Sequence, residues 1–342
     1  MVNSRFQSLV TLLFMAGIAT MYSCSDNKNE SILSFSDLSG PYLGQNLSGD
    51  DPEIFAPGLI STEMYTRDIA MMPDGNEIYF CVSAMGYNLI FYTKQIDGIW
   101  TEPEPASFIA DFDKMYYEPH ITTDGKRLLF LSDMPVSETE LPTQDIWAVD
   151  RLGGDTWGVP YNLGIPINTD GNEYFPSTTK DGTLYFTRAE KGSRIHYIYR
   201  SKLINGKYQE PERLSDNVNC GTNRYNAFID PDERFIIVPT VGMEDGLGGT
   251  DYYIVFRDED DNWDIPVNLG TKVNQERGAE WSPYVSPDGK YFFFMSDRTN
   301  KLNISAEGIP TYKKLRDLFR KPGNGNSSIY WMKSDFLFEL QK

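Results

Sequence analysis

The sequence predicts an all-β protein, a five-bladed β-propeller with four antiparallel strands in each blade. Three observations predict it: a recurring turn motif, a second motif at a constant distance from the first, and an N-terminal strand that completes the last repeat. The turn motif is Asp-Gly, a hairpin signal because glycine adopts positive φ cheaply, and a short apolar run follows each copy. Its aspartates are Asp74, Asp124, Asp181, Asp232 and Asp288, with spacings of 50, 57, 51 and 56 residues. Glu233 replaces the glycine in the fourth repeat, so we expect that turn to differ.

The second motif is an aromatic residue followed three positions later by proline. It occurs as Trp100/Pro103, Trp157/Pro160, Tyr208/Pro211 and Trp263/Pro266, and 21 or 22 residues separate each proline from the next turn aspartate. Each repeat therefore holds four short strands: one before the turn, one after it, a third such as 145–151, and a fourth that starts at the aromatic residue. This content is typical of a propeller blade, whereas the alternative, a β-sandwich, lacks such a period.

The N-terminus of the domain is expected to close the ring. The fifth repeat lacks the aromatic–proline strand, but Pro52 precedes Asp74 by 22 residues, as the other prolines do. Residues 52–58 should therefore complete the last blade and remove the open sheet edges. The propeller is expected to span 52–342, with an insertion at 299–327.

The insertion is expected to contain a short helix from Pro310 to Lys321. Leu315, Leu318 and Phe319 fall on one face of this helix, and Pro322-Gly323 ends it. That face is expected to cap the propeller; the alternative is contact with a protein partner.

Residues 1–23 are expected to be a signal peptide. Arg5 supplies a positive charge, and Phe6 to Tyr22 is an apolar run too short for a comfortable membrane span. Cys24 and a polar stretch follow, and the segment resembles a bacterial lipoprotein signal of the Bacteroidota type. The resemblance implies that Cys24 is acylated and becomes the new N-terminus; ordinary secretion is the alternative. Residues 24–51, rich in Ser, Asp, Asn and Gly, are expected to form a flexible tether.

Composition narrows the classes of partner. The net charge of −18 repels phosphate backbones, so we expect no nucleic-acid partner. Two histidines and three cysteines leave little material for a His/Cys metal site, and no cofactor or metal is expected. Cys81 follows an apolar run and Cys220 lies in a loop, and a disulfide between them is left open.

Three segments carry a family resemblance. Residues 157–188, 248–274 and 280–297 resemble the WD-like, Pro-Asp-repeat propellers of the TolB-like type, and the resemblance extends over 52 to about 337. It implies an extracytoplasmic propeller that acts as a binding or scaffolding module, and it implies no single reaction. Function inferred from the fold alone is analogy.

The inner strands supply the candidate site residues. Counted back from each turn by strict alternation, one face carries a mostly apolar level that is expected to pack between blades. Its members are Arg67, Tyr117, Tyr174, Tyr225 and Trp281. The other face is expected to line a concave mouth, and it carries Thr66, Tyr116, Glu173, Arg224 and Glu280, then Asp68, Glu118, Phe175, Asn226 and Ser282, then His120 and Tyr284.

These positions admit three interpretations. The first is a site for a small polar ligand such as a sugar or an acidic oligosaccharide, whose candidate residues are Arg67, Asp68, His120, Arg224, Asn226, Trp281 and Tyr284. The second is catalysis, in which Glu118 with Glu173 or Glu280 acts as acid and base on a glycosidic bond. The third is structural: Arg224 lies between Glu173 and Glu280 and forms inter-blade ion pairs that set the register.

The sequence thus predicts a lipid-anchored protein of the cell envelope, in the outer membrane with a periplasmic or surface orientation. We expect a non-catalytic binding or scaffolding module whose partner is an envelope protein or a glycan. The alternatives are a carbohydrate-active enzyme that uses the channel carboxylates, and an accessory lipoprotein that captures glycans for a transporter. Whether any catalysis occurs stays open at this point.

Overall fold

The computed structural model describes residues 34–137, 143–276, 278–299 and 308–341. The expected signal peptide and Cys24 lie outside these residues. By its internal contacts the chain divides into two compact units, Met1–Ile32 and Leu33–Lys342, and the described residues all belong to the second. Within that part of the chain, no helix is both long enough and apolar enough to span a membrane.

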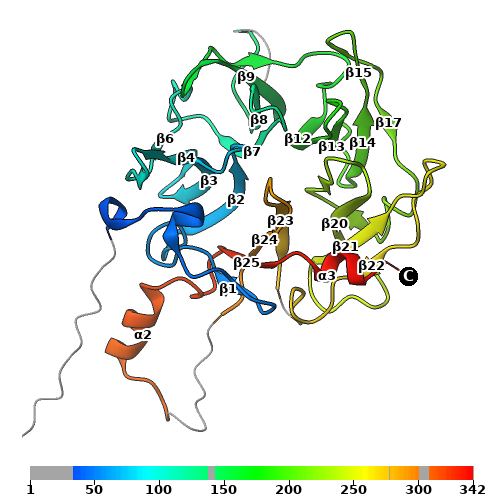
Figure 1. The fold of residues 1–342 in the computed structure, drawn as a ribbon. Helices are drawn as coiled ribbons and strands as arrows, with labels where there is room; N and C mark the ends of the chain where they lie inside the picture. Colours follow the sequence, from blue (N-terminus) through cyan, green and yellow to red (C-terminus); the bar gives the residue numbers. More distant parts are fainter. Residues whose placement is uncertain (1–33, 138–142, 277, 300–307, 342) are drawn as a thin grey trace, which may run out of the picture. The chain divides into compact units, whose positions relative to one another are not determined.

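Five antiparallel sheets stand around a common axis, which confirms the predicted five-bladed β-propeller (Figure 1). In each blade the strand that leads into the turn aspartate lies innermost. Blade 1 contains β2 (Tyr65–Met71), β3 (Glu77–Ala84), β4 (Tyr87–Ile96), β5 (Ile99–Trp100) and β6 (Glu104–Pro105). Blade 2 contains β7 (Tyr116–Ile121), β8 (Arg127–Ser132), β9 (Asp145–Gly153), β10 (Thr156–Trp157) and β11 (Tyr161–Asn162).

The other three blades repeat this arrangement. Blade 3 contains β12 (Asn172–Thr178), β13 (Leu184–Ala189), β14 (Tyr197–Ser201) and β17 (Glu212–Arg213), with a small hairpin of β15 (Leu203–Ile204) and β16 (Lys207–Tyr208). Blade 4 contains β18 (Asn223–Arg224), β19 (Phe228–Ile229), β20 (Phe235–Val241), β21 (Asp251–Phe256) and β22 (Val267–Asn268). Blade 5 contains β23 (Glu280–Val285), β24 (Tyr291–Ser296), β25 (Ser328–Lys333) and β1 (Glu53–Ile54).

The outermost strand of each blade begins directly after the motif proline. We expected it to start at the aromatic residue, but β6, β11, β17 and β22 follow Pro103, Pro160, Pro211 and Pro266. The aromatic residues instead turn inward onto the preceding blade. The indole of Trp157 donates from Nε1 to the Tyr79 hydroxyl at 2.9 Å, and Trp157 and Trp263 are both buried. Trp157 and Trp263 of this motif therefore stabilise the contact between neighbouring blades.

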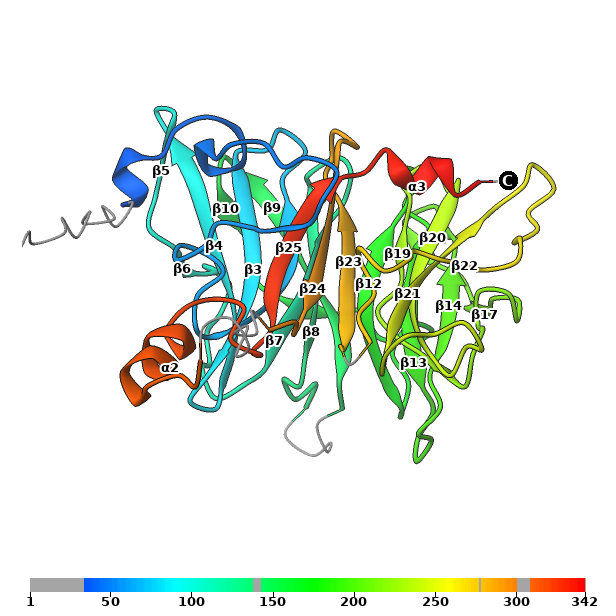
Figure 2. The same cartoon turned by 90° about the horizontal axis from the view of Figure 1, so that it is seen from below.

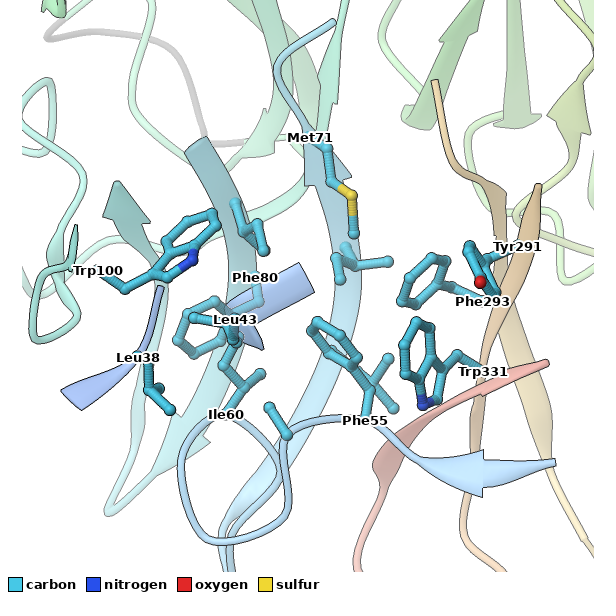
Figure 3. Close-up of a cluster of buried hydrophobic side chains, with 14 of the residues drawn as sticks. Leu38, Leu43, Phe55, Ile60, Met71, Phe80, Trp100, Tyr291, Phe293 and Trp331 are labelled. Atoms are coloured by element: carbon cyan, nitrogen blue, oxygen red, sulfur yellow. The ribbon is translucent and has the colours of Figure 1, made fainter. Parts of the chain in front are cut away.

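The ring closes as predicted through the N-terminal strand β1. Glu53 pairs with Trp331 and Ile54 with Tyr330 of β25, in antiparallel register. Phe55 follows this short strand and is fully buried, with its ring centroid 5.1 Å from that of Phe293 and 5.3 Å from that of Trp331 (Figure 3). Packing of Phe55, more than the two paired residues, fixes the junction between the first and last blades.

Residues 34–51 are packed on the propeller, whereas a tether was expected over 24–51; residues 24–33 of that tether lie outside the described residues. Phe35 begins the short 3-10 helix η1 (Phe35–Asp37), Leu38 follows it, and Leu43 lies in η2 (Pro41–Gly44); all three are buried in the core cluster that contains Phe55. Three apolar side chains in a Ser/Gly-rich stretch were enough to hold it on the propeller. All five blades and the strand that closes the ring thus lie within the compact unit Leu33–Lys342.

The turn of the fourth repeat does not differ from the others, so that expectation was wrong. Glu233 takes the left-handed conformation with φ +55°, as Gly75 does with φ +72°. Its amide donates to the Asp230 carbonyl at 2.8 Å, and the equivalent bond of Gly75 to Met72 is also 2.8 Å. The Glu233 carboxylate accepts from the Tyr185 hydroxyl at 2.7 Å, and this contact offsets the strain of a positive φ.

The side view separates the two ends of the propeller (Figure 2). The short helix α3 (Phe336–Glu339) follows β25 at the end that carries the Asp-Gly turns. The helix α2 (Tyr312–Phe319) belongs to the insertion between β24 and β25 and lies at the other end. It begins and ends within the expected range, but none of its residues is buried. The expected capping role is therefore wrong.

Candidate functional site

Each inner strand contains one extra residue, and this bulge shapes the channel. In blade 1, Arg67 pairs with Cys81 and Ile69 with Phe80, so that Asp68 has no partner in β3. The same one-residue irregularity occurs in every blade. The bulge residues are Asp68, Glu118, Phe175, Asn226 and Ser282, and all have φ between +40° and +60°. A bulge shifts the alternation of side chains by one position, so faces counted on either side of it do not continue into each other.

Four of these bulge residues, together with Arg67, close the channel with a polar plug, which we define as Arg67, Asp68, Glu118, Asn226 and Ser282. Arg67 contacts Asp68 through Nε at 2.9 Å and Glu118 through Nη2 at 2.9 Å. Asn226 donates from Nδ2 to Glu118 Oε1 at 3.1 Å, and the Ser282 hydroxyl donates to Asp68. A cavity of only 20 Å³ remains beside these groups. The plug therefore ties blades 1, 2, 4 and 5 together at the axis.

Glu118 is the central acceptor of the plug. Besides Arg67 and Asn226, it accepts the backbone N–H of Phe175 at Oε2, at 2.8 Å. Burial raises the pKa of Glu118 to about 7, against the opposing influence of Arg67. Three donors occupy three of the roughly four acceptor positions of this carboxylate, and Glu118 is only 4% exposed, so little of it is open to an incoming substrate.

A belt of aromatic rings lies next to the plug. It consists of Tyr117, Tyr174, Tyr225 and Trp281, and as expected it bridges neighbouring blades. The centroids of Tyr225 and Trp281 are 5.0 Å apart, and the guanidinium of Arg67 lies 5.4 Å from the Tyr117 centroid. The Tyr174 hydroxyl and His196 Nδ1 form a hydrogen bond of 2.6 Å. Tyr117, Tyr225 and Trp281 stay half-buried, so the belt also forms a surface.

The level expected to line the mouth is instead buried. Thr66, Tyr116, Glu173, Arg224 and Glu280 all lie inside the protein. The guanidinium of Arg224 donates to the backbone carbonyls of Cys220, Gly221 and His196, at 3.2, 3.0 and 3.0 Å. These bonds satisfy the Arg224 guanidinium locally, and the expected ion pairs with Glu173 and Glu280 do not form. The structural interpretation of Arg224 was therefore wrong, whereas its role in binding a ligand stays a prediction.

Glu173 and Glu280 are held within their own blades and do not join Glu118. Glu173 pairs with Arg188 Nε at 2.9 Å and accepts from Thr169, and it is fully buried. Glu280 accepts from the Ser296 hydroxyl at 3.2 Å, and burial raises its pKa to about 8. Glu118, Glu173 and Glu280 therefore do not form the pair of open carboxylates that the catalytic interpretation requires.

A second feature, the turn-side cavity, opens at the other side of the plug. Its volume is 460 Å³, and residues from all five Asp-Gly turns border it. His120, Phe228 and Tyr284 lie on its floor, next to the plug residues, and Leu337 and Phe338 of α3 form part of its wall. Two of the expected ligand residues, His120 and Tyr284, are thus brought together here.

The hydrogen bonds of His120 define its state. The Thr178 backbone N–H donates to His120 Nε2 at 2.9 Å, so Nε2 is unprotonated and Nδ1 carries the hydrogen. The Thr178 hydroxyl lies 2.8 Å from the same nitrogen and donates to it as well. Burial lowers the pKa of His120 to about 4. The ring is therefore neutral at physiological pH, with its hydrogen on Nδ1.

The charged groups at the rim of the turn-side cavity neutralise one another. Lys180 Nζ lies 2.7 Å from Asp232, and Arg234 Nη2 lies 2.8 Å from Asp230. Asp288 accepts from the Tyr42 hydroxyl at 2.9 Å. Sequence reasoning missed these charged rim residues as a group, although each is a turn aspartate or lies within two residues of one. The turns were interpreted only as connections between strands. Closure of the ring brings all five turns to the mouth of the turn-side cavity, and the sequence analysis did not draw this consequence.

The remaining candidate chemistry is structural. Cys81 and Cys220 are both buried free thiols, so no disulfide joins them. Among the described residues, no group of three or more His, Cys, Asp or Glu side chains could hold a metal ion.

The chain is distantly similar to solved β-propellers, and this similarity concerns the fold alone. A TolB protein of Agrobacterium tumefaciens matches with a TM-score of 0.47 and 14% identity, over 79% of this chain and 90% of the other. TolB of Acinetobacter baumannii matches with a TM-score of 0.45 and 16% identity, over 79% and 57%. The periplasmic gluconolactonase of Pseudomonas aeruginosa gives 0.38 and 11%, over 67% and 64%. No protein-family model and no curated protein sequence matches the chain.

Proposed function

We propose that the protein is a non-catalytic binding module of the cell envelope, anchored through Cys24, that binds a neutral saccharide in the turn-side cavity. The observation that carries the proposal is the cavity itself. Its volume of 460 Å³ lies within the range of small-molecule sites, and it is closed at its floor by the polar plug.

The walls of the cavity suit a ligand that has both apolar faces and hydroxyl groups. Phe228 and Tyr284 present rings, while Thr122, Thr178 and His120 present polar groups. The His120 Nδ1–H can donate to a sugar oxygen, because Nε2 is already occupied by Thr178. The rim charges are paired with one another, so an anionic ligand finds no free cation. These features favour a neutral saccharide over the acidic oligosaccharide that the sequence also allowed.

Catalysis is the weaker candidate for the same channel. Glu118 is engaged by three donors, and Glu173 and Glu280 are fully buried in separate blades. An inverting or retaining glycosidase needs two carboxyl groups that flank one bond. Binding without cleavage is the function that this arrangement supports best.

Isothermal titration calorimetry with a panel of neutral mono- and oligosaccharides tests the proposal. Thr123 borders the cavity at the blade 2 turn, and Thr123→Trp should fill its mouth. For any saccharide that binds, we expect this variant to weaken the affinity at least roughly tenfold. Thr271→Trp is the matched control, because Thr271 is exposed and lies outside the cavity.

Two outcomes contradict the proposal. If no saccharide binds, and a stoichiometric envelope protein is retained by the wild type and lost from Thr123→Trp, the ligand is a protein. If the wild type releases reducing ends from a bound oligosaccharide, the protein is an enzyme, and Glu118→Gln becomes the variant to measure.

A further inference from the structure

Helix α2 stands apart from the propeller core in both composition and environment. It begins after Thr311, whose hydroxyl accepts the Lys314 N–H at 3.2 Å, and it ends at Phe319, before Pro322 and Gly323. It projects at the periphery of the ring, beside the closing blade (Figures 1 and 2). Every described core cluster excludes it. The propeller therefore does not need this helix for its packing.

One face of α2 is apolar and uncovered. Tyr312, Leu315 and Phe319 are 80%, 51% and 62% exposed, and the spacing of three and four residues places them on the same side. Together with Leu318 they border an open groove of 960 Å³ against the edge of the closing blade. Large apolar side chains are rarely gathered in the open on a soluble surface unless that surface has a partner.

The segment that contains α2 is basic, and two of its basic residues, Arg316 and Lys321, border the groove beside the apolar side chains. The segment 310–321 contains five basic residues and one acid, Asp317, which gives it a net charge of +4 in a chain of net charge −18. Its basic residues are Lys313, Lys314, Arg316, Arg320 and Lys321. Only charges within a Debye length of about 8–10 Å act strongly on a nearby surface, so this local positive charge outweighs the acidic body at close range.

We infer that α2 is a contact site for the surface of an anionic lipid bilayer. A basic amphipathic helix lies in the plane of such a surface, with its apolar side chains at the acyl boundary and its basic side chains among the headgroups. Tyr312, Leu315 and Phe319 would enter the boundary, and the basic residues would face the anionic lipids. The inference is independent of the saccharide proposed for the turn-side cavity.

A lipid surface fits α2 better than a second copy of the chain. Eight helical residues are about 12 Å long, and a stable dimer buries roughly 800 Å² on each partner. So short a helix cannot supply that area, whereas each basic residue near an anionic bilayer adds attraction of its own. The positive charge of the α2 segment therefore favours an anionic membrane surface over a second copy of the chain as its partner.

Co-sedimentation with vesicles tests the inference. The segment 33–342 is used, because it contains all five blades in one compact unit and lacks the apolar run Phe6 to Tyr22. We expect it to sediment with phosphatidylcholine vesicles that contain phosphatidylglycerol, to stay in solution with phosphatidylcholine alone, and to be released by high salt.

Two double variants separate the basic from the apolar side chains of this segment. Arg320→Gln with Lys321→Gln should lower the partition coefficient about 30-fold, since each base contributes about five- to sixfold. Leu315→Ser with Phe319→Ser should lower it at least roughly tenfold through lost apolar burial. The matched control combines Lys191→Gln with Ile265→Ser, because both positions are exposed and remote from α2 in sequence. All variants should keep the wild-type melting temperature.

Three results would overturn the inference. Binding to both kinds of vesicle, or to neither, contradicts recognition of anionic lipid. Equal loss of binding in the control and the α2 variants shows that the helix is not the contact. A lipid-free dimer in analytical ultracentrifugation that the α2 variants dissociate assigns the helix to self-association instead.

Discussion

At the scale of single residues, burial sets the protonation state of Glu280. Glu280 is fully buried, its Oε1 accepts from Ser296, and its Oε2 has no hydrogen-bond partner among the described residues. Burial therefore raises its pKa to about 8. In the unfolded chain the pKa of a glutamate is about 4.3. Between these values the folded state holds a proton that the unfolded state has lost, so stability falls as pH rises through this window.

Glu280→Gln should remove this pH dependence, because the amide stays neutral at every pH. Between pH 5 and 8 we expect the unfolding free energy of the wild type to fall by roughly 1 kcal/mol per pH unit more than that of the variant. Urea denaturation at a series of pH values measures it. Glu102→Gln, at an exposed position, is the control and should parallel the wild type. Parallel curves for Glu280→Gln would show that Glu280 is ionised in the folded protein.

At the scale of elements, the bulge in each inner strand explains which site residues could be predicted. Strict alternation placed Asp68, Asn226, His120 and Tyr284 correctly at the channel or the cavity. It failed for Arg224, which lies before the bulge of its strand. The bulge shifts the alternation by one position, so a side chain before it points to the opposite face from the one that counting back from the turn predicts. The five bulge residues are Asp, Glu, Phe, Asn and Ser, which share no chemical property. They share only the left-handed backbone conformation, and no pattern in the sequence predicts that conformation at these positions.

At the closing strand β1, the stability of the protein is expected to depend on the side chain of Phe55. Phe55→Ala empties a fully buried ring site between Phe293 and Trp331. Such a truncation should reduce the unfolding free energy by about 3–5 kcal/mol. Urea unfolding followed by tryptophan fluorescence measures it. Phe112→Ala, at an exposed position, is the matched control and should change stability by less than about 1 kcal/mol. Equal losses in the two variants would mean that β1 closes the ring without depending on this contact.

At the scale of the whole molecule, the sequence predicts what repeats locally and misses what forms across the ring. Each blade carries its own Asp-Gly turn and its own proline, so five blades and their closure follow from spacing alone. The plug instead joins Arg67 to Glu118 and Glu118 to Asn226, which are 51 and 108 residues apart. The turn-side cavity likewise needs one turn from every blade. Such sites exist only once the ring is closed, which is why they could not be derived from a single repeat.

The proposed attachment to the envelope has two parts, an acyl anchor on Cys24 and the contact through α2, and a salt wash distinguishes them. If Cys24 carries acyl chains, it provides strong anchoring, whereas contact through α2 alone is weak and electrostatic. Wild-type protein should therefore stay in the membrane fraction during a high-salt wash and be released by detergent. Cys24→Ala should be released by the salt wash, because screening removes the remaining attraction of α2. Immunoblots of the washed fractions measure both. A Cys24→Ala protein that resists the salt wash contradicts the acyl anchor, and a wild type that is already soluble indicates ordinary secretion.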